Sequence, residues 1–334
     1  MLSVKNPIMT GFFPDPSICR VGNKFYTVHS TFAYFPGVPV FESEDLVHWN
    51  LISNVLDRDS QVPLSGCQHS EGIFAPTIRY HKGTWYMITT NVSDQGNFIV
   101  TAKDPRGPWS EPYYLGESTG GIDPSLFFDD DGTCYYIGQR PRSAGYRYNG
   151  DCEIWIQTLD LDTMQLKPDA TIVLTGFQRK AIWPEGPHLY KKDGYYYILH
   201  AESGTSIHHS VMIARSKNVF GPYEYCPCNP ILTHRHLGAQ YPVTCVGHAD
   251  LVDDGNGNWY MVVLACRPNQ GYTLLGRETF LAKVTWEDGW PVVNAGVGHL
   301  EEVVTLPYEG QPSDDVPQCK TYTFDTPSLP LELL

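Results

Sequence analysis

The sequence Asp15-Pro-Ser-Ile-Cys-Arg-Val-Gly-Asn-Lys-Phe-Tyr26 decides the fold, because its pattern returns four more times along the chain. Each copy runs through a short apolar stretch and a turn of Gly, Asp, Asn or Lys to an aromatic stretch that contains a tyrosine. These tyrosines follow one another at intervals of 49 to 63 residues. The later copies are Ala75–Tyr86, Asp123–Tyr135, Gly186–Tyr197 and His248–Tyr260.

Each copy predicts a β-hairpin, because β-branched and aromatic residues flank a turn. Segments with turn chemistry follow most hairpins, as in Ser43–Trp49, and helical periodicity of useful length is almost absent. Five units of roughly 50–60 residues, each with about four strands, are typical of a propeller, whose radial sheets leave few open edges. We therefore predict an all-β chain folded as a five-bladed β-propeller. The alternative, a chain of two β-sandwich domains, would not explain five copies in register.

The composition favours a neutral partner with apolar faces, such as a sugar. The 334 residues include 23 Lys and Arg against 37 Asp and Glu, a net charge of −14 that disfavours nucleic acid. Aromatic residues make up 13% of the chain, which suits stacking on sugars. No apolar window predicts a membrane span, and the N-terminus lacks a signal-peptide pattern. The nine cysteines, an odd number without paired metal-ligand spacing, suggest reduced thiols and a cytoplasmic location.

The start of the first strand is equivalent in all five copies, so the repeat itself predicts which residues meet. The innermost strands of a propeller line its central channel, and their starts should form a ring at one mouth. Together with Glu185, which precedes the fourth ring member, the ring would gather three carboxyl groups and a histidine. The ring members are Asp15, Ala75, Asp123, Gly186 and His248.

Carboxyl groups gathered near an apolar rim repel one another and lose hydration, and both effects separate their pKa values. Glycoside hydrolysis needs such a separation, because one carboxyl protonates the leaving oxygen while another, ionised, activates water or attacks the sugar. A single aspartate before proline is an ordinary residue at the start of a strand. Three acids at matching channel positions are not required by blade packing, so the ring suggests a hydrolytic site.

Aromatic side chains near the ring are candidates for a sugar-binding wall. Phe32 and Phe35 follow the first hairpin, and Phe74 precedes Ala75, which is also counted among the sugar-binding positions. Packing between blades is the other interpretation of these phenylalanines. Arg277 has no obvious local partner; it could grip sugar hydroxyls, hold an acid in the channel, or form a surface salt bridge.

Six segments together resemble glycoside hydrolase family 43, most closely its β-xylosidase and α-L-arabinofuranosidase branch. The resemblance runs from about residue 6 to about residue 300, with every motif in the family's order. The segments are Gly11–Ser17, Phe74–Thr77, Gly121–Ser125, Trp183–His188, Gly247–Asp250 and Leu275–Thr279.

This resemblance implies a five-bladed propeller enzyme that hydrolyses with inversion. By position, Asp15 resembles the general base that activates water, and Glu185 the general acid. Asp123 resembles the third acid, which orients Glu185 and tunes its pKa. Inversion leaves room for a water, so the resemblance implies carboxyl groups of Asp15 and Glu185 about 6.5–9.5 Å apart.

The resemblance extends to the residues around these acids. Arg277 matches an arginine that holds the sugar at the non-reducing end, and Phe32 and Phe74 match aromatic residues of the pocket wall. His248 matches a channel histidine that is often near a calcium ion or a water. A calcium ion bound through water is therefore a candidate, although no cofactor is expected to be required.

We expect an exo-acting enzyme that releases terminal xylose or arabinofuranose from xylo-oligosaccharides or arabinoxylan-derived sugars. The alternatives are an endo-arabinanase-like hydrolase, disfavoured by the aromatic insertion after the first hairpin, and a non-catalytic carbohydrate-binding propeller, disfavoured by the three acids. Relatives often continue into a β-sandwich domain. We therefore expect residues 1–300 to form the catalytic propeller and residues 301–334 a C-terminal tail or linker that begins such a domain. A homo-oligomer is a further expectation.

Overall fold

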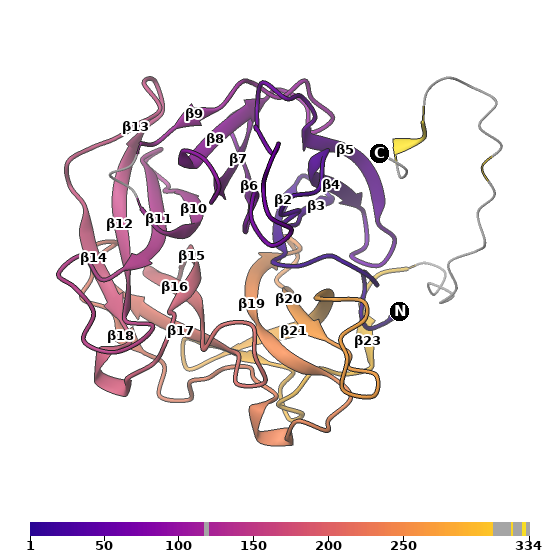
Figure 1. Ribbon diagram of the computed structural model, residues 1–334. Coiled ribbons are helices and arrows are strands. Elements are labelled where there is room, and N and C mark those ends of the chain that lie inside the picture. Colours follow the sequence, from indigo (N-terminus) through magenta and orange to yellow (C-terminus); the bar gives the residue numbers. More distant parts are fainter. Residues whose placement is uncertain (117–119, 310–321, 323–328, 332–334) are drawn as a thin grey trace.

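The computed structural model describes residues 1–116, 120–309, 322 and 329–331. Five antiparallel sheets stand around a central axis as the blades of a propeller (Figure 1). The predicted all-β, five-bladed fold is confirmed. The helical elements with described bounds are two single 3₁₀ turns, η1 (Phe177–Arg179) and η2 (Arg235–Leu237). No helix in these ranges is long and apolar enough to cross a membrane.

The blades follow the order of the chain, and within each blade consecutive strands are neighbours. Blade 1 contains β2 (Ser17–Val21), β3 (Lys24–Val28), β4 (Gly37–Ser43) and β5 (Asn50–Leu56). Blade 2 contains β6 (Thr77–His81), β7 (Thr84–Asn91), β8 (Gly96–Ala102) and β9 (Tyr113–Tyr114). Blade 3 contains β10 (Ile122–Phe128), β11 (Cys134–Pro141), β12 (Cys152–Asp160), β13 (Gln165–Leu166) and β14 (Thr171–Thr175), the last pairing with β12. Blade 4 contains β15 (Glu185–Lys192), β16 (Tyr195–Glu202), β17 (Ser210–Ser216) and β18 (Glu224–Tyr225). Blade 5 contains β19 (Thr244–Asp253), β20 (Trp259–Cys266), β21 (Glu278–Glu287) and β22 (Trp290–Val293).

The five repeats form the first two strands of the five blades, as the hairpin pattern predicts. Local chemistry explains the tight turns. Lys82 and Gly83, between β6 and β7, both have positive φ (46° and 82°), and so do Asp193 and Gly194 between β15 and β16 (49° and 74°). Two residues with positive φ give the hairpin turn whose twist matches the flanking strands. The sequence thus specifies each hairpin at its turn.

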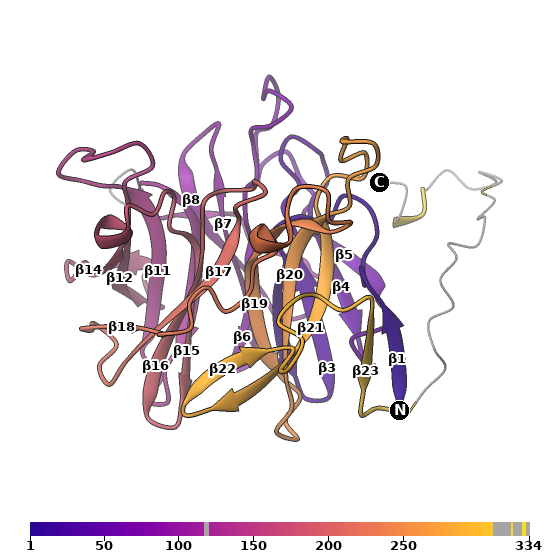
Figure 2. The same cartoon turned by 90° about the horizontal axis from the view of Figure 1, so that it is seen from below.

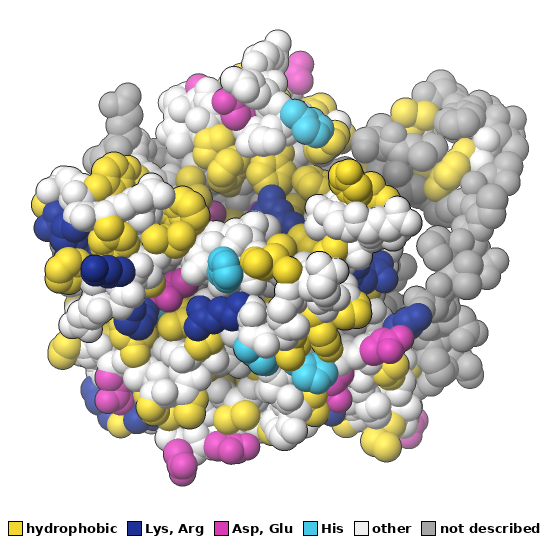
Figure 3. All heavy atoms as spheres, turned by 60° about the horizontal axis from the view of Figure 1, so that its bottom comes forward, with side chains coloured by type: hydrophobic (Ala, Val, Ile, Leu, Met, Phe, Trp, Pro, Cys, Tyr) yellow, Lys and Arg dark blue, Asp and Glu magenta, His cyan; other side chains and the backbone are white. Residues whose placement is uncertain are grey.

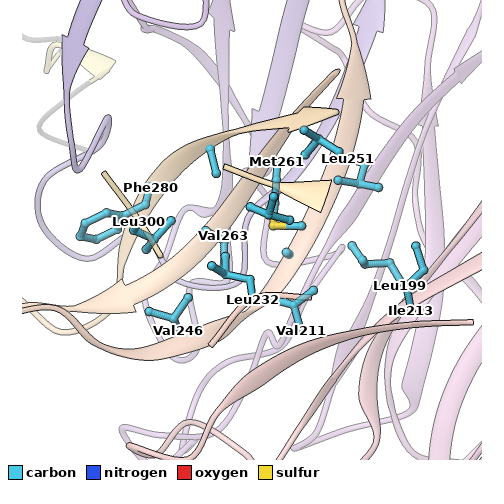
Figure 4. Packing of buried hydrophobic residues seen from close by; sticks show 14 of the residues in the cluster. Leu199, Val211, Ile213, Leu232, Val246, Leu251, Met261, Val263, Phe280 and Leu300 are labelled. Atoms are coloured by element: carbon cyan, nitrogen blue, oxygen red, sulfur yellow. The ribbon is translucent and has the colours of Figure 1, made fainter. Parts of the chain in front are cut away.

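The hydrophobic core is divided among the spaces between neighbouring blades. The largest cluster joins blades 4 and 5, where Leu199 and Ile213 face Met261 and Val263 (Figure 4). Similar clusters lie between each of the other neighbouring pairs, which closes the ring. The recurring tyrosines lie on the second strands; Tyr135 is half-buried and the other four are buried. Their spacing along the sequence therefore reflects blade packing.

The two ends of the described propeller meet beside blades 5 and 1. Strand β1 (Leu2–Lys5) pairs with β23 (Val303–Leu306) as a separate two-stranded sheet (Figure 2). The Asn6 side chain also bonds to the backbone N–H and C=O of Leu281, at 2.8 Å each, in β21 of the last blade. Strand β23 lies beyond residue 300, where the propeller was expected to end. The boundary itself remains a prediction, and most of the expected tail lies outside the described residues.

The first strands of the blades are the innermost ones. Strand β2 contacts β6 and β19, and β10 contacts β6 and β15, so these strands line the axis. Their starts consequently lie at one mouth of the channel, where the ring of repeat-equivalent residues was predicted.

Candidate active site

An unusual backbone conformation marks the predicted ring. Asp15, Asp123, Gly186 and His248 have positive φ values of 53°, 55°, 58° and 50°, whereas Ala75 does not. Positive φ is rare for most residues but is tolerated by glycine and is enriched in Asp and His. The register also shifts at this point in blades 3, 4 and 5, as in a β-bulge. Because a bulge re-aims side chains, the ring residues are directed by the backbone itself.

The ring borders a cavity of about 330 Å³, at the small end of the range for small-molecule sites. Residues from all five blades line it. The face tilted forward in Figure 3 carries hydrophobic side chains around a hollow. The lining consists of Asp15, Phe32, Phe74, Ala75, Ile122, Asp123, Glu185, Thr205, His248 and Arg277. The structure thus brings the three predicted acids together; their roles remain predictions.

Asp15 is held as a carboxylate. Arg277 Nη1 donates to Asp15 Oδ1 at 2.7 Å, and the Ser30 hydroxyl donates to Oδ2 at 2.6 Å. Burial raises the pKa of Asp15, but the positive charge of Arg277, aided by His248 and the Ser30 bond, outweighs it and leaves the pKa below its ordinary value. Of the three interpretations of Arg277, the structure shows the one in which it holds an acid.

The pKa values of the other two acids, Asp123 and Glu185, are raised rather than lowered. Burial and the nearby Asp15 charge raise the pKa of Asp123 to about 6, although His248 opposes them. Burial, followed by repulsion from Asp123 and Asp15, raises the pKa of Glu185 well above its ordinary value. Gly186 N–H donates to Asp123 Oδ2 at 2.9 Å, which ties Asp123 to the residue after Glu185. One cavity therefore contains a carboxyl group with a lowered pKa beside two carboxyl groups with raised pKa values.

Two of the three predicted aromatic residues form the apolar wall. The rings of Phe32 and Phe74 lie 5.3 Å apart with their planes at 62°, and the Arg277 guanidinium lies 5.1 Å from the Phe32 ring centre. Ala75, 4% exposed, continues the wall. Phe35 is not among the lining residues, and 45% of its surface is exposed, so the structure does not bring it to the cavity.

His248 lies against Gly186 at the edge of the cavity. A Cβ at position 186 would lie 2.9 Å from the His248 ring, so the positive φ and the close approach both require glycine there. Within the described ranges, no group of three or more His, Cys, Asp or Glu side chains is arranged to hold a metal ion. The calcium ion suggested for His248 is therefore not confirmed.

Sequence reasoning missed two polar residues of the site, Ser30 and Thr205. Both follow the second strand of a repeat hairpin, β3 and β16 respectively. In an antiparallel hairpin the end of the second strand lies beside the start of the first. The repeat alignment that located the ring could therefore also have located these residues, at the ends of the second strands.

A family model and curated relatives both match this chain over most of its length. The family model described as "Glycosyl hydrolases family 43" matches residues 4–291. The chain is 66% identical over 307 residues to a protein named "Xylosidase/arabinosidase" from Butyrivibrio fibrisolvens, covering 92% of this chain and 59% of that protein. It is 46% identical to a non-reducing end α-L-arabinofuranosidase of Bacteroides ovatus, covering 91% of this chain and 55% of the relative.

A solved structure shares the fold. The xylan β-1,4-xylosidase of Bacillus halodurans superposes with a TM-score of 0.83 at 41% identity, over 92% of this chain and 61% of that one. The chain therefore spans less than two thirds of the length of these relatives.

Proposed function

Because the chain belongs to glycosyl hydrolase family 43, we propose that it is an exo-acting, inverting glycosidase that releases terminal xylose or arabinofuranose from xylan-derived oligosaccharides. One observation carries this proposal. In a single cavity, Asp15 has a lowered pKa and Glu185 a raised one. Two carboxyl groups with separated pKa values are what acid–base hydrolysis of a glycoside requires.

The proposed reaction uses each acid in a different protonation state. Glu185 donates its proton to the glycosidic oxygen as the bond to the sugar breaks. Asp15 accepts a proton from a water molecule, which attacks the opposite face of the sugar and inverts its configuration. Asp123 bonds to the Gly186 N–H and raises the pKa of Glu185 by its charge, so it acts through the general acid. Arg277 keeps Asp15 ionised between turnovers.

The size and lining of the cavity support a single terminal sugar as the reacting unit. A volume of about 330 Å³ is small, and Phe32 and Phe74 offer apolar surface on one side. Relatives with the printed names of xylosidase and arabinofuranosidase support pentose substrates for this chain as well. The choice between the two pentoses is open to a direct assay.

The test compares aryl glycosides whose leaving groups differ in basicity. We expect the chain to hydrolyse 4-nitrophenyl β-xyloside or 4-nitrophenyl α-arabinofuranoside. Replacing Glu185→Gln should slow a phenyl glycoside by about 10²- to 10⁴-fold and a dinitrophenyl glycoside much less, because a good leaving group needs little protonation. Equal losses on both substrates would contradict the acid role, and no turnover by the unsubstituted chain would contradict the function.

Two product analyses complete the test. Nuclear magnetic resonance during hydrolysis should show the product sugar first in the anomeric configuration opposite to that of the substrate. Retention of configuration would contradict inversion. Chromatography of products from a long xylo-oligosaccharide should show a monosaccharide and a chain shortened by one unit. A mixture of internal fragments would instead favour the endo-acting alternative.

A further inference from the structure

Ser30 lies behind the wall of the acid cavity. Its residue surface is 1% exposed, and it is not among the residues that line the cavity. Blade 1 brings it there, because Val28, at the end of β3, pairs with Ser17, at the start of β2. Two residues further along, the Ser30 N–H donates to Pro14 C=O at 3.2 Å. The first hairpin therefore ends with Ser30 beside Asp15.

The Ser30 hydroxyl has Asp15 as its single hydrogen-bond partner within the described residues, and it donates to Oδ2 at 2.6 Å. A hydroxyl bond this short to a carboxylate is typical of the strong, charge-assisted kind. The other carboxylate oxygen, Oδ1, accepts from Arg277 at 2.7 Å. With one donor on each oxygen, the carboxylate cannot turn about its last side-chain bond without breaking both. Ser30 and Arg277 together therefore fix the plane of this carboxylate.

The two donors differ in what else they can touch. Arg277 lines the cavity and lies 5.1 Å from the Phe32 ring centre, so removing it would change the space offered to a ligand as well as the charge beside Asp15. Ser30 is sealed behind Asp15 and does not line the cavity. A substitution at Ser30 therefore changes the orientation of Asp15 without removing a group that a ligand could contact.

We propose that Ser30 is a positioning residue for the hydrolytic reaction, which aims the Asp15 carboxylate at the attacking water without touching the substrate. This inference rests on the proposed function, in which Asp15 accepts the proton of that water. Without the hydroxyl, Arg277 alone holds the carboxylate, and Oδ2 loses its donor. A general base that is free to turn is correctly aimed for a smaller part of the time, and the rate of the chemical step falls accordingly.

The same bond favours the ionised form of Asp15, so its loss should also raise the pKa of this group. The acid limb of kcat/KM reports that pKa, and it should therefore move to higher pH. None of the other titratable groups that interact electrostatically with Asp15 bonds to the Ser30 hydroxyl, so they remain in place when it is removed. These groups are Arg277 and His248 of blade 5, Asp123 of blade 3, Glu185 and His209 of blade 4, and His29 next to Ser30.

The kinetic test compares Ser30→Ala with a matched control, Ser53→Ala. Ser53 lies in β5, the outermost strand of the same blade, where its buried hydroxyl donates to Pro105 C=O at 2.7 Å. On an aryl glycoside, Ser30→Ala should lower kcat by about 3- to 10-fold and move the acid limb up by about 0.5–1 pH unit, the effect of one hydrogen bond. KM should stay within about twofold, and the control should change none of these quantities. An unmoved acid limb, or a rise in KM with kcat unchanged, would overturn the proposal.

A titration that needs no turnover separates the failure of this inference from the failure of the proposed function. Carbon-13 magnetic resonance of labelled aspartate carboxyl carbons follows Asp15 directly, with an Asp15→Asn spectrum to assign its signal. Ser30→Ala should move the Asp15 midpoint to higher pH, whereas Ser53→Ala should leave it in place. An unchanged midpoint would overturn the role of Ser30 even in a chain that hydrolyses glycosides. A midpoint that moves in a chain without any glycosidase activity would instead overturn the proposed function, on which this role depends.

Discussion

Two successive layers of side chains inside the propeller both contain buried acids. The acid of one layer has a strongly lowered pKa, whereas two of the three acids in the other have raised pKa values. The mouth layer is the ring at the cavity, with Asp15, Asp123 and the adjacent Glu185. The second layer consists of the residues two positions further along each innermost strand. Its members are Ser17, Thr77, Ser125, His188 and Asp250. In each layer, one arginine bonds to a buried aspartate: Arg277 bonds to Asp15 and Arg79 bonds to Asp250.

In the second layer, both carboxylate oxygens of Asp250 accept hydrogen bonds. Asp250 accepts hydrogen bonds from Arg79, from the Ser17 hydroxyl at 2.8 Å and from the Tyr190 hydroxyl at 2.5 Å. Burial raises the pKa of Asp250, but Arg79 and the other partners outweigh it and lower the pKa to about 2. Arg79 also bonds to His188 at 3.0 Å, so one side chain of blade 2 ties together blades 1, 4 and 5.

The mouth layer has fewer cationic partners for each acid than the second layer has. Its three carboxyl groups share Arg277, which bonds to Asp15. Glu185 and Asp123 consequently have raised pKa values. The comparison teaches that the balance of partners to acids, rather than burial alone, separates a structural network from a site that can exchange protons.

The largest expected effect comes from removing the carboxylate that Arg277 holds. Asp15→Asn should lower kcat on an aryl glycoside by about 10²- to 10⁴-fold, because Asp15 is the proposed acceptor of the proton of the attacking water. The fold should survive, since asparagine tolerates the positive φ at this position. Steady-state kinetics with a thermal melt checks both points, and Asp193→Asn in an exposed hairpin turn is the control. A rate within a few-fold of the unsubstituted chain would remove Asp15 from the mechanism.

Breaking the second layer should affect stability instead. Arg79→Met leaves the Asp250 carboxylate buried without its cation, which costs about 3–5 kcal/mol of unfolding free energy. Urea unfolding measures this loss. The control is Arg58→Met: Arg58 pairs with two carboxylates on the surface, where the loss should stay below about 1 kcal/mol. Similar losses in the two variants would show that the second layer does not hold the blades together.

The mouth layer should show the reverse behaviour, because its acid is held at the expense of stability. Since the folded chain raises the pKa of Glu185 above its ordinary value of 4.5, ionisation of this group favours unfolding as the pH rises. Glu185→Gln should therefore stabilise the fold at pH 7.5, by roughly 0.5–2 kcal/mol, the range of typical stabilising substitutions. The gain should vanish at pH 4, where the carboxyl is protonated in both states. Urea unfolding at both pH values checks this, and a destabilised variant at pH 7.5 would contradict it.

The smallest expected effect is a shift in the pH dependence of kcat/KM. Above its pKa of about 6, Asp123 is ionised, and its charge raises the pKa of Glu185. Asp123→Asn removes that charge, so the alkaline limb of kcat/KM should move to lower pH. The control, Asp131→Asn in an exposed turn of the same blade, should leave the limb in place. An alkaline limb displaced to higher pH would contradict the coupling.

Much of this architecture could be predicted because it is repeated. Five hairpins with the same turn chemistry predict five blades, and equivalent positions in a repeat become neighbours around an axis. The ring was predicted because its members begin equivalent strands of the repeat, and the positive φ at four of its five positions suits the Asp, Gly and His residues found there. The same alignment, advanced by two residues, would also have revealed the second layer.

Features that are not repeated could not be predicted from the pattern. Strand β14 and the pairing of β1 with β23 depend on packing between distant segments. The interpretation of Arg277 stayed open because its partner, Asp15, is 262 residues away in sequence. Phe35 has the residue type and position of a wall residue, but the chain turns it outward, and sequence alone does not specify that direction.

The central claim is that Glu185 is protonated at neutral pH while Asp15 is ionised. Carbon-13 magnetic resonance of the chain labelled at the side-chain carboxyl carbons of Glu and Asp tests it directly, with Glu185→Gln and Asp15→Asn spectra to assign the signals. The account predicts a Glu185 signal that still has its protonated position at pH 7 and an Asp15 signal that is already ionised at pH 4. A Glu185 signal that is fully ionised by pH 5 would contradict the account.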